Sequence, residues 1–325
     1  MTSSISFGDL RPDQFLGAVD SLGLRCDGRF LSLNSYENRV YQINLEDNEP
    51  IVAKFYRPNR WSDEAILEEH QFAEELQSAE IPVVAPFQIA SKTLHNSHGF
   101  RFALYPRKGG RTPELDNLDL LQQIGRLVAR IHKIGQIQPF QHRPAITLDT
   151  FGIEAATRLL KSNLLPIELS SVYEQTCEHV LAGIDQTLET IPYQTLRTHG
   201  DLHPSNVLVR GEQIHIVDLD DTRTAPAIQD LWMFLSGQRS EQTPQMEKLL
   251  EGYHEFHSLD MRELHLIEAL RSLRIIHYAA WLGDRWQEPA FQRAFPWFNS
   301  QKYWEEHVLS LKEQIALMQE DPLLT

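Results

Sequence analysis

The chain has 325 residues, 42% of them hydrophobic and 23% charged, which is the composition of an ordinary globular protein. Its formal net charge of −15 argues against a nucleic-acid-binding protein, because such proteins present a basic surface to the phosphate backbone. We expect no membrane segment, since no stretch approaches the roughly 18 consecutive apolar residues of a membrane-spanning helix. The two cysteines and the lack of a signal-peptide pattern predict a cytoplasmic protein.

The N-terminal part is predicted to form a small sheet with one main helix. Runs of β-branched and aromatic residues alternate with polar turns, which is typical of strands. A helical period of apolar residues begins at Asp63, with Ser62 or Asp63 as its N-cap. The predicted elements are, in order, a helix at residues 12–22, strands at 30–33, 39–43 and 51–56, a helix from 63, and strands at 87–90 and 100–105.

The polar turn at residues 34–38, between two predicted strands, is a candidate nucleotide loop. Ser35 and the backbone N–H groups could donate hydrogen bonds to phosphates. The turn contains no glycine, so it is not the glycine-rich loop of protein kinases. An ordinary hairpin explains this segment equally well.

A lysine in the middle of an apolar strand indicates a phosphate site. Lys54 lies within residues 51–56, where a charged side chain needs a partner or a path to solvent. The structural alternative is an edge strand with Lys54 in water. We predict that Lys54 contacts the α- and β-phosphates of a nucleotide. Glu69 of the next helix is predicted to orient it, with Glu68 as second choice.

Regular secondary structure is predicted to end after the strand at residues 100–105, where Pro106 precedes the pair Gly109 and Gly110. We place a hinge there, and expect backbone groups around Tyr105 to hydrogen-bond an adenine ring. The hinge divides the chain into a predicted nucleotide-binding domain at residues 1–106 and a predicted helical domain at residues 107–325.

The second domain is predicted to be helical. Gly125 would allow its first helix to pack closely, and His132, at the end of that helix, is expected to be a hydrogen-bonded structural residue. Asp230 is a candidate brace for a neighbouring loop. Four tryptophans, at 281, 286, 297 and 304, suggest core packing or, less simply, an aromatic box for a quaternary ammonium ion. Helices are predicted at residues 118–132, 153–163, 167–189, from 226, and at 243–258, 261–283 and 301–318.

The most informative stretch spans residues 196–221. A polar loop containing Asp201 and Asn206 runs into two short apolar strands joined by a turn, and the second strand ends at Asp218. The hairpin would bring the three side chains to one end of a sheet. One carboxylate can accept a proton from an attacking hydroxyl, while the other two oxygens suit Mg²⁺. The spacing matches the kinase catalytic loop and its metal-binding acid.

Two other interpretations of this stretch carry less weight. Asp, Asn, Gly and Pro are common in ordinary loops, so an acidic turn beside a hairpin would explain each residue singly. His199 and His203 could bind zinc, but no further soft ligands are nearby in the sequence.

Taken together, these motifs resemble the protein-kinase-like fold in its aminoglycoside, choline and homoserine phosphotransferase branch. More narrowly, LNSYENRVYQ, VAKFYRP, HGDLHPSN and VDLDD resemble the bacterial stress response kinase A family of Ser/Thr protein kinases. The resemblance implies an α+β, bilobal fold, with a small antiparallel-sheet N-lobe and a larger helical C-lobe. It also implies a monomer that uses ATP and Mg²⁺ to phosphorylate Ser/Thr hydroxyls of a protein substrate.

The resemblance assigns a role to each candidate residue. Asp201 would accept the hydroxyl proton, and Asn206 and Asp218 would bind Mg²⁺, with Asp218 also counted as catalytic and Asp220 a further metal candidate. The candidates for nucleotide binding are Ser35, Lys54, Glu69 and Tyr105.

The chain departs from protein kinases in ways that affect the substrate. The loop reads His199-Gly200-Asp201, without the usual arginine, and Asp218 is followed by too few residues for a long activation segment. A small-molecule hydroxyl kinase, acting on an aminoglycoside, an amino alcohol or a sugar, is therefore the second hypothesis. A nucleotide-sensing protein without catalysis is the third, and is disfavoured because Lys54, Asp201, Asn206 and Asp218 are all present.

Overall fold

The computed structural model describes residues 10–324, which divide into two compact units. Of these residues, those up to Pro113 together with Phe140–Arg143 and His203–Thr222 form the first unit, and the others form the second. The hairpin after Asp201, which the predicted division placed in the C-terminal domain, therefore groups with the first unit.

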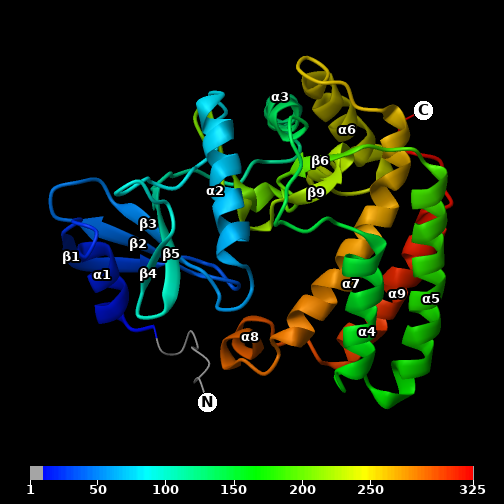
Figure 1. The fold of residues 1–325 in the computed structure, drawn as a ribbon. Helices are drawn as coiled ribbons and strands as arrows, with labels where there is room; N and C mark the ends of the chain where they lie inside the picture. Colours follow the sequence, from blue (N-terminus) through cyan, green and yellow to red (C-terminus); the bar gives the residue numbers. More distant parts are fainter. Residues whose placement is uncertain (1–9, 325) are drawn as a thin grey trace. The chain divides into compact units, whose positions relative to one another are not determined.

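The first unit is built on a five-stranded antiparallel sheet in the order β1-β2-β3-β5-β4 (Figure 1). Strand β3 lies in the middle, with Lys54 opposite Val40 of β2 and Ala103 of β5. The edge-strand alternative for Lys54 is therefore wrong. The strands are β1 (Cys26–Ser32), β2 (Arg39–Leu45), β3 (Ile51–Phe55), β4 (His95–Ser97) and β5 (Phe100–Pro106).

Helices cover both faces of this sheet. Helix α1 (Pro12–Asp20) packs Phe15 against Tyr41, with ring centroids 4.0 Å apart, in a core that also includes Phe55. Helix α2 (Asp63–Ser78) begins at the N-cap Ser62, which accepts a hydrogen bond from the Ala65 N–H at 3.2 Å. Since side chains alternate along a strand, Phe55 faces α1 while its neighbour Lys54 faces α2.

The predicted strand at residues 87–90 is wrong. Ala90 and Ser91 both have positive φ angles, 49° and 62°, and two successive left-handed residues end an extended run. They form a turn in which Ile89 pairs only with Lys92. The strand that pairs with β5 is instead β4.

A hairpin of β7 (Val207–Arg210) and β8 (Gln213–Ile216) completes the first unit. The Ile216 N–H donates to the Pro82 carbonyl at 2.9 Å, and its carbonyl accepts from Val84 at 3.0 Å. A β-carbon on Gly110 would lie 2.8 Å from the Leu208 β-carbon, so this chain crossing requires glycine. Backbone contacts thus join the hairpin to segments about a hundred or more positions earlier in the chain.

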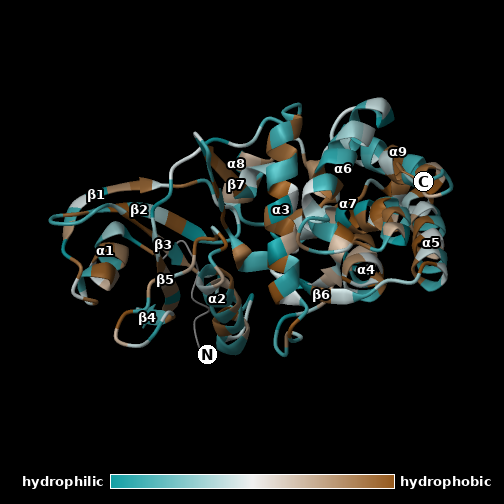
Figure 2. Cartoon of the chain, turned by 90° about the horizontal axis from the view of Figure 1, so that it is seen from above, coloured by the Kyte–Doolittle hydropathy of each residue, from teal (hydrophilic) through white to brown (hydrophobic). Residues whose placement is uncertain are grey.

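The second unit is mainly helical (Figure 1). Helices α3 and α6 pack against each other, and α4, α5, α7 and α9 form a neighbouring group. In Figure 2, apolar and polar residues alternate along α3, whose buried side includes Leu121, Ile124 and Val128. The helices are α3 (Leu118–Gly135), α4 (Glu154–Lys161), α5 (Ile167–Thr190), α6 (Arg239–Tyr253), α7 (Ile267–Asp284), α8 (Pro289–Ala294) and α9 (Gln301–Leu317).

Glycines set the distance between α3 and α6. A β-carbon on Gly125 would lie 2.0 Å from the Leu249 carbonyl oxygen, and one on Gly252 would lie 1.9 Å from that of Gln122. Any larger residue would push the helices apart. The close packing predicted at Gly125 is confirmed.

Three predictions for this unit are corrected. The α-helix expected from residue 226 is a pair of 3₁₀ turns, Ala227–Asp230 and Trp232–Phe234. Helix α3 does not end at His132 but continues to Gly135. A two-stranded ribbon of β6 (Thr195–Thr198) and β9 (Arg223–Pro226) was not predicted. Among residues 10–324, no helix has both the length and the apolar character to cross a membrane.

Candidate active site

Lys54 lies at the centre of a carboxylate cluster in the first unit. Its Nζ atom is 3.5 Å from Glu69, 3.2 Å from Asp218 and 3.0 Å from Asp220. Burial lowers the pKa of Lys54, but the three carboxylates outweigh burial and hold that pKa well above its ordinary value. The lysine is therefore a permanent positive charge.

Glu69 lies in α2 between two cations, with Lys54 on one side and Arg143 at 3.9 Å on the other. Burial raises the pKa of Glu69 to about 7, against the opposing influence of Lys54. Glu68 has a different role, because its carboxylate accepts hydrogen bonds from the N–H groups of Gln141, His142 and Arg143 at 2.6–2.9 Å. Of the two predicted partners, Glu69 is thus the one that contacts Lys54.

Asp218 and Asn206 lie at the same end of the β7–β8 hairpin. The Asn206 carbonyl accepts a hydrogen bond from the Val217 N–H at 3.0 Å, directly before Asp218. Asp218 has a left-handed backbone, with φ 61° and ψ 65°, which is uncommon for a residue with a side chain. This turn leaves the Asp218 side chain 55% exposed although it contacts the buried Lys54.

One cavity of about 340 Å³ in the first unit joins these residues. Its volume is within the usual range for small-molecule sites, and its walls combine apolar side chains with a few polar groups. Val40, Val52 and Leu208 are among the apolar residues. The cavity brings together six residues singled out from the sequence: Ser35, Lys54, Glu69, Tyr105, Asn206 and Asp218.

The donor atoms in this cavity suit Mg²⁺ with a nucleotide. Asp218 offers a carboxylate and Asn206 an amide oxygen, and Mg²⁺ takes such hard ligands together with waters and substrate phosphates. Within residues 10–324, no group of three or more His, Cys, Asp or Glu side chains is arranged to hold a metal ion. The donors therefore fit a metal that arrives with phosphates better than one held in an all-protein cage.

Asp201 belongs to the second unit, where its loop is firmly held. The buried Asp230 carboxylate accepts hydrogen bonds from the N–H groups of His199 at 2.7 Å and Gly200 at 2.9 Å. His132 contacts the same carboxylate at 3.1 Å. Burial raises the pKa of Asp230, but these hydrogen bonds and nearby imidazoles keep it below its ordinary value. Asp230 and His132 thus have structural positions beside the loop.

Asp201 also has a partner that sequence reasoning missed. The Arg274 guanidinium on α7 donates to one carboxylate oxygen of Asp201. Arg274 is separated from Asp201 by 73 positions, and nothing in the sequence marks it out from the other arginines.

The structure gives Asp220 a different environment from the one expected of a metal ligand. Its side chain is 4% exposed and contacts both Lys54 and Arg60. Burial raises the pKa of Asp220, but Lys54 and Arg60 together lower it to about 2. Asp220 is therefore an ionised, buried partner of two cations.

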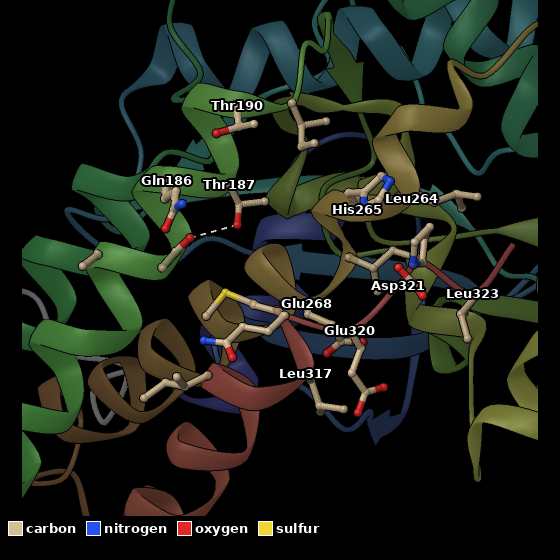
Figure 3. A pocket seen from close by; sticks show the side chains of 18 of the residues that line it. Gln186, Thr187, Thr190, Leu264, His265, Glu268, Leu317, Glu320, Asp321 and Leu323 are labelled. Carbon is tan, nitrogen blue, oxygen red and sulfur yellow. Dashed lines mark hydrogen bonds between the residues drawn. The ribbon is translucent and has the colours of Figure 1, made fainter. Parts of the chain in front are cut away.

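A larger cavity of about 690 Å³ in the second unit contains none of the predicted site residues (Figure 3). It lies among α5, the start of α7 and the end of α9. Three of its charged side chains have partners, since Arg239 lies 3.6 Å from Glu320 and Glu268 lies 3.6 Å from Arg271. Thr187 turns back to donate to the Gly183 carbonyl at 2.8 Å. We assign no chemistry to this cavity.

The four C-terminal tryptophans pack against other rings. Trp281 contacts Phe291 at a centroid distance of 5.2 Å, and Trp286 contacts Phe298 at 5.0 Å. Trp304 is fully buried. Trp297 is 46% exposed and contacts Tyr303 at 5.3 Å, so three of the four are packed among other rings or buried and the fourth lies at the surface.

Comparison with known proteins gives two kinds of match. A model of the phosphotransferase enzyme family matches residues 29–297. Stress response kinase A of Escherichia coli O157:H7 is 43% identical over 321 residues, covering 99% of this chain and 97% of that protein. Serine/threonine protein kinase RdoA of Salmonella typhimurium strain LT2 is 40% identical with the same coverage.

Solved structures share the fold at low sequence identity. An amicoumacin kinase in complex with AMP-PNP, Ca²⁺ and Ami matches with a TM-score of 0.72 at 18% identity, over 96% of this chain and 95% of that one. A spectinomycin phosphotransferase with ADP and spectinomycin matches with a TM-score of 0.66 at 17% identity, over 94% and 99%. These matches confirm the predicted α+β, protein-kinase-like fold.

Proposed function

Because the chain belongs to the phosphotransferase enzyme family, we propose that it is an ATP- and Mg²⁺-dependent Ser/Thr protein kinase of a bacterial stress response. The observation that carries the proposal is the single cavity lined by Lys54, Asn206 and Asp218. The name of one relative, a serine/threonine protein kinase, supplies the acceptor, a serine or threonine hydroxyl. The neighbours solved with AMP-PNP and ADP support a nucleotide as donor.

Each residue has a defined task in this proposal. Lys54, held by Glu69, neutralises the α- and β-phosphates, while Ser35 and the backbone at Tyr105 position the nucleotide. Asn206 and Asp218 hold Mg²⁺, which supplies positive charge on the phosphates when bound.

Asp201 accepts the proton of the attacking hydroxyl. Its loop is suited to that task because the Asp230 carboxylate fixes the two preceding N–H groups. We further propose a monomer that works in the cytoplasm, in keeping with the two unpaired cysteines Cys26 and Cys177.

A small-molecule acceptor is the second candidate, and one feature favours it. Between Asp218 and the 3₁₀ turn at Ala227 the chain forms only a short turn and strand β9. The long activation segment that helps to position peptides in protein kinases has no counterpart there. The amicoumacin and spectinomycin kinases, whose names give small-molecule acceptors, share this fold.

The test offers γ-labelled ATP and Mg²⁺ to the purified protein with protein substrates, aminoglycosides and amino alcohols in parallel. Asp201→Asn should reduce transfer by roughly 10²- to 10⁴-fold through loss of the general base. It should leave ATP affinity unchanged, because Asp201 is not among the residues that line the nucleotide cavity. Label on protein serine or threonine supports the proposal, whereas label only on a small molecule replaces it with the second candidate.

A further inference from the structure

Arg60 occupies an unusual position in the first unit. It lies in the segment between β3 and α2, yet its side chain is only 13% exposed. Its guanidinium binds both carboxylate oxygens of Asp221, at 2.7 and 2.8 Å, and also donates to Asp220. Nη2 contacts both oxygens of Asp221 and Nη1 donates to Asp220, so that one guanidinium joins the two aspartates. Arg60 thus anchors the turn that directly follows Asp218.

Arg60 also contacts the candidate nucleotide loop. Its Nε atom lies 3.6 Å from Glu37, a residue of the polar turn at 34–38. Arg57 binds the same carboxylate at 2.9 Å and donates to the Glu37 carbonyl at 3.0 Å. The two arginines therefore share Glu37, and Arg60 in addition contacts Asp220 and Asp221.

A third arginine binds backbone carbonyl groups of the same turn. Arg143 donates to the carbonyl oxygens of Asp220 and Thr222, the latter at 2.8 Å. Its guanidinium and that of Arg60 both lie over the Trp61 ring, at 4.4 and 5.0 Å from the centroid. The turn is thus held through its side chains by Arg60 and through its backbone by Arg143.

The charges of this cluster single out Asp218. Among the described residues joined by these ion pairs, four cations meet five carboxylates. Asp218 is the most exposed of the five carboxylates, at 55%, whereas Asp221 is 31% exposed and the others are 12% or less. If Asp218 turns to a metal ion, Lys54 keeps Glu69 and Asp220 as its partners. The cations are Lys54, Arg57, Arg60 and Arg143, and the remaining carboxylates are Glu37, Glu69, Asp220 and Asp221.

We propose that Arg60 is a positioning residue for the metal site: by binding Asp220 and Asp221, it holds Asp218 in its left-handed conformation, ready for Mg²⁺. In many kinases, arginine contacts to a phosphorylated residue order the segment after the metal-binding acid. Here two aspartates provide the negative charge permanently. The inference rests on the proposed role of Asp218 in binding Mg²⁺, but not on the identity of the acceptor.

The test measures Mg²⁺-dependent binding of AMP-PNP by calorimetry in the full-length protein, so it needs no acceptor substrate. Arg60→Gln should raise the Mg²⁺ concentration for half-maximal binding by about tenfold or more, the usual effect of losing a residue that orients a metal ligand. Binding of AMP-PNP in excess EDTA should stay within about twofold of the wild type. Asp221→Asn should also raise the Mg²⁺ concentration for half-maximal binding, by a smaller factor.

Arg57→Gln is the matched control, because it removes an arginine from the same segment and the same Glu37 contact. It should leave the Mg²⁺ requirement unchanged. An equal shift in Arg57→Gln would overturn the proposal, since the effect would then act through the nucleotide loop. An unchanged Mg²⁺ requirement in both Arg60→Gln and Asp221→Asn would also overturn it. Asp221→Asn keeps the test decisive if Arg60→Gln does not fold.

The two proposals fail in different ways. Wild-type protein that binds AMP-PNP with Mg²⁺ but labels no protein substrate would contradict the proposed function and leave the role of Arg60 standing. Wild-type protein whose AMP-PNP affinity does not depend on Mg²⁺ would overturn the role of Arg60, because there would be no metal site to position.

Discussion

At the scale of single residues, the main feature of the site is a buried lysine surrounded by carboxylates. A buried lysine is tolerated when carboxylates surround it, and the carboxylates are tolerated because of the lysine. Lys54 has three such partners, Glu69, Asp218 and Asp220. The residue that would neutralise phosphates is therefore also a main element of the unit's internal charge balance, and stability and activity depend on the same side chain.

Lys54→Met should therefore reduce both the stability of the protein and its activity. Removing one partner of a buried ion pair destabilises by about 3–5 kcal/mol, and the methionine leaves Glu69 and Asp220 facing each other without their shared cation. The double variant Lys54→Met/Glu69→Gln should recover part of the stability and none of the phosphoryl transfer. Denaturant unfolding and ATP turnover would be measured for both. Recovery of turnover in the double variant would show that Lys54 does not act on the nucleotide.

His70 predicts a dependence of stability on pH. Burial, reinforced by the nearby Lys54 charge, lowers the pKa of His70 to about 3. The His70 ring forms hydrogen bonds with the hydroxyl groups of Tyr56 at 2.7 Å and Thr93 at 2.8 Å. Because the ordinary histidine pKa is about 6.5, protonation favours the unfolded state below that pH. The stabilising contribution is present above pH 6.5 and is lost as the pH falls towards 3.

At pH 5 this effect is about 2 kcal/mol. The wild type should therefore lose more unfolding free energy between pH 7.5 and 5 than His70→Gln, in which that titration is absent. Equal losses in the two proteins would contradict the assignment.

At the scale of elements, the second unit depends on how closely α3 and α6 approach. The two glycines that permit this contact, Gly125 and Gly252, lie on different helices, and each faces a backbone carbonyl of the other helix. Helix α3 also carries His132, which contacts the Asp230 carboxylate that braces the Asp201 loop. Helix α3 thus connects the packing of α3 against α6 with the order of the Asp201 loop.

Gly125→Ala should therefore destabilise the protein even though alanine favours helices. The added β-carbon would lie 2.0 Å from the Leu249 carbonyl oxygen, so the helices must separate, at a cost of about 1–3 kcal/mol or more. Gly17→Ala in α1 is the matched control, because nothing lies within 4 Å of its β-carbon position. It should be neutral or stabilise by up to about 1 kcal/mol. Thermal unfolding of both variants distinguishes packing from helix propensity.

Local sequence patterns singled out Lys54 within an apolar strand, and Asp201, Asn206 and Asp218 at kinase spacing. The structure brings Lys54, Asn206 and Asp218 together in one cavity. Arg60, Arg143 and Arg274 could not be found from local sequence, because each acts on a residue far away in the chain. The predicted strand at 87–90 was wrong because Ala90 and Ser91 adopt left-handed conformations that their residue types do not announce. The helix expected from 226 was wrong for a tertiary reason, since Gln229 and Asp230 use their side chains to bind the loop at His199–Gly200.

At the scale of the whole molecule, the short segment after Asp218 bears on whether activity requires phosphorylation of the enzyme. A 3₁₀ turn at Leu219–Asp221, held by Arg60, is followed directly by strand β9. Arg60 contacts two aspartates of this segment, Asp220 and Asp221, whose negative charge is part of the sequence. The enzyme is therefore expected to be active as translated.

Phosphatase treatment of the purified enzyme should leave its specific activity unchanged within about twofold, whereas kinases ordered by activation-loop phosphorylation lose most of theirs. Intact mass before and after treatment verifies that any phosphate was removed. A large loss of activity that accompanies loss of phosphate would mean that a modified residue outside this turn orders the site.

The discontinuous course of the first unit limits how such an enzyme can evolve. Its sheet is encoded before Pro113, but the hairpin with Asn206 and the turn with Asp218 are encoded much later, at His203–Thr222. A recombination event that exchanged only the 5′ part of the gene would pair a new nucleotide pocket with an old metal site. Cassettes taken from this gene would have to carry both segments to keep together the residues that line the cavity with Lys54.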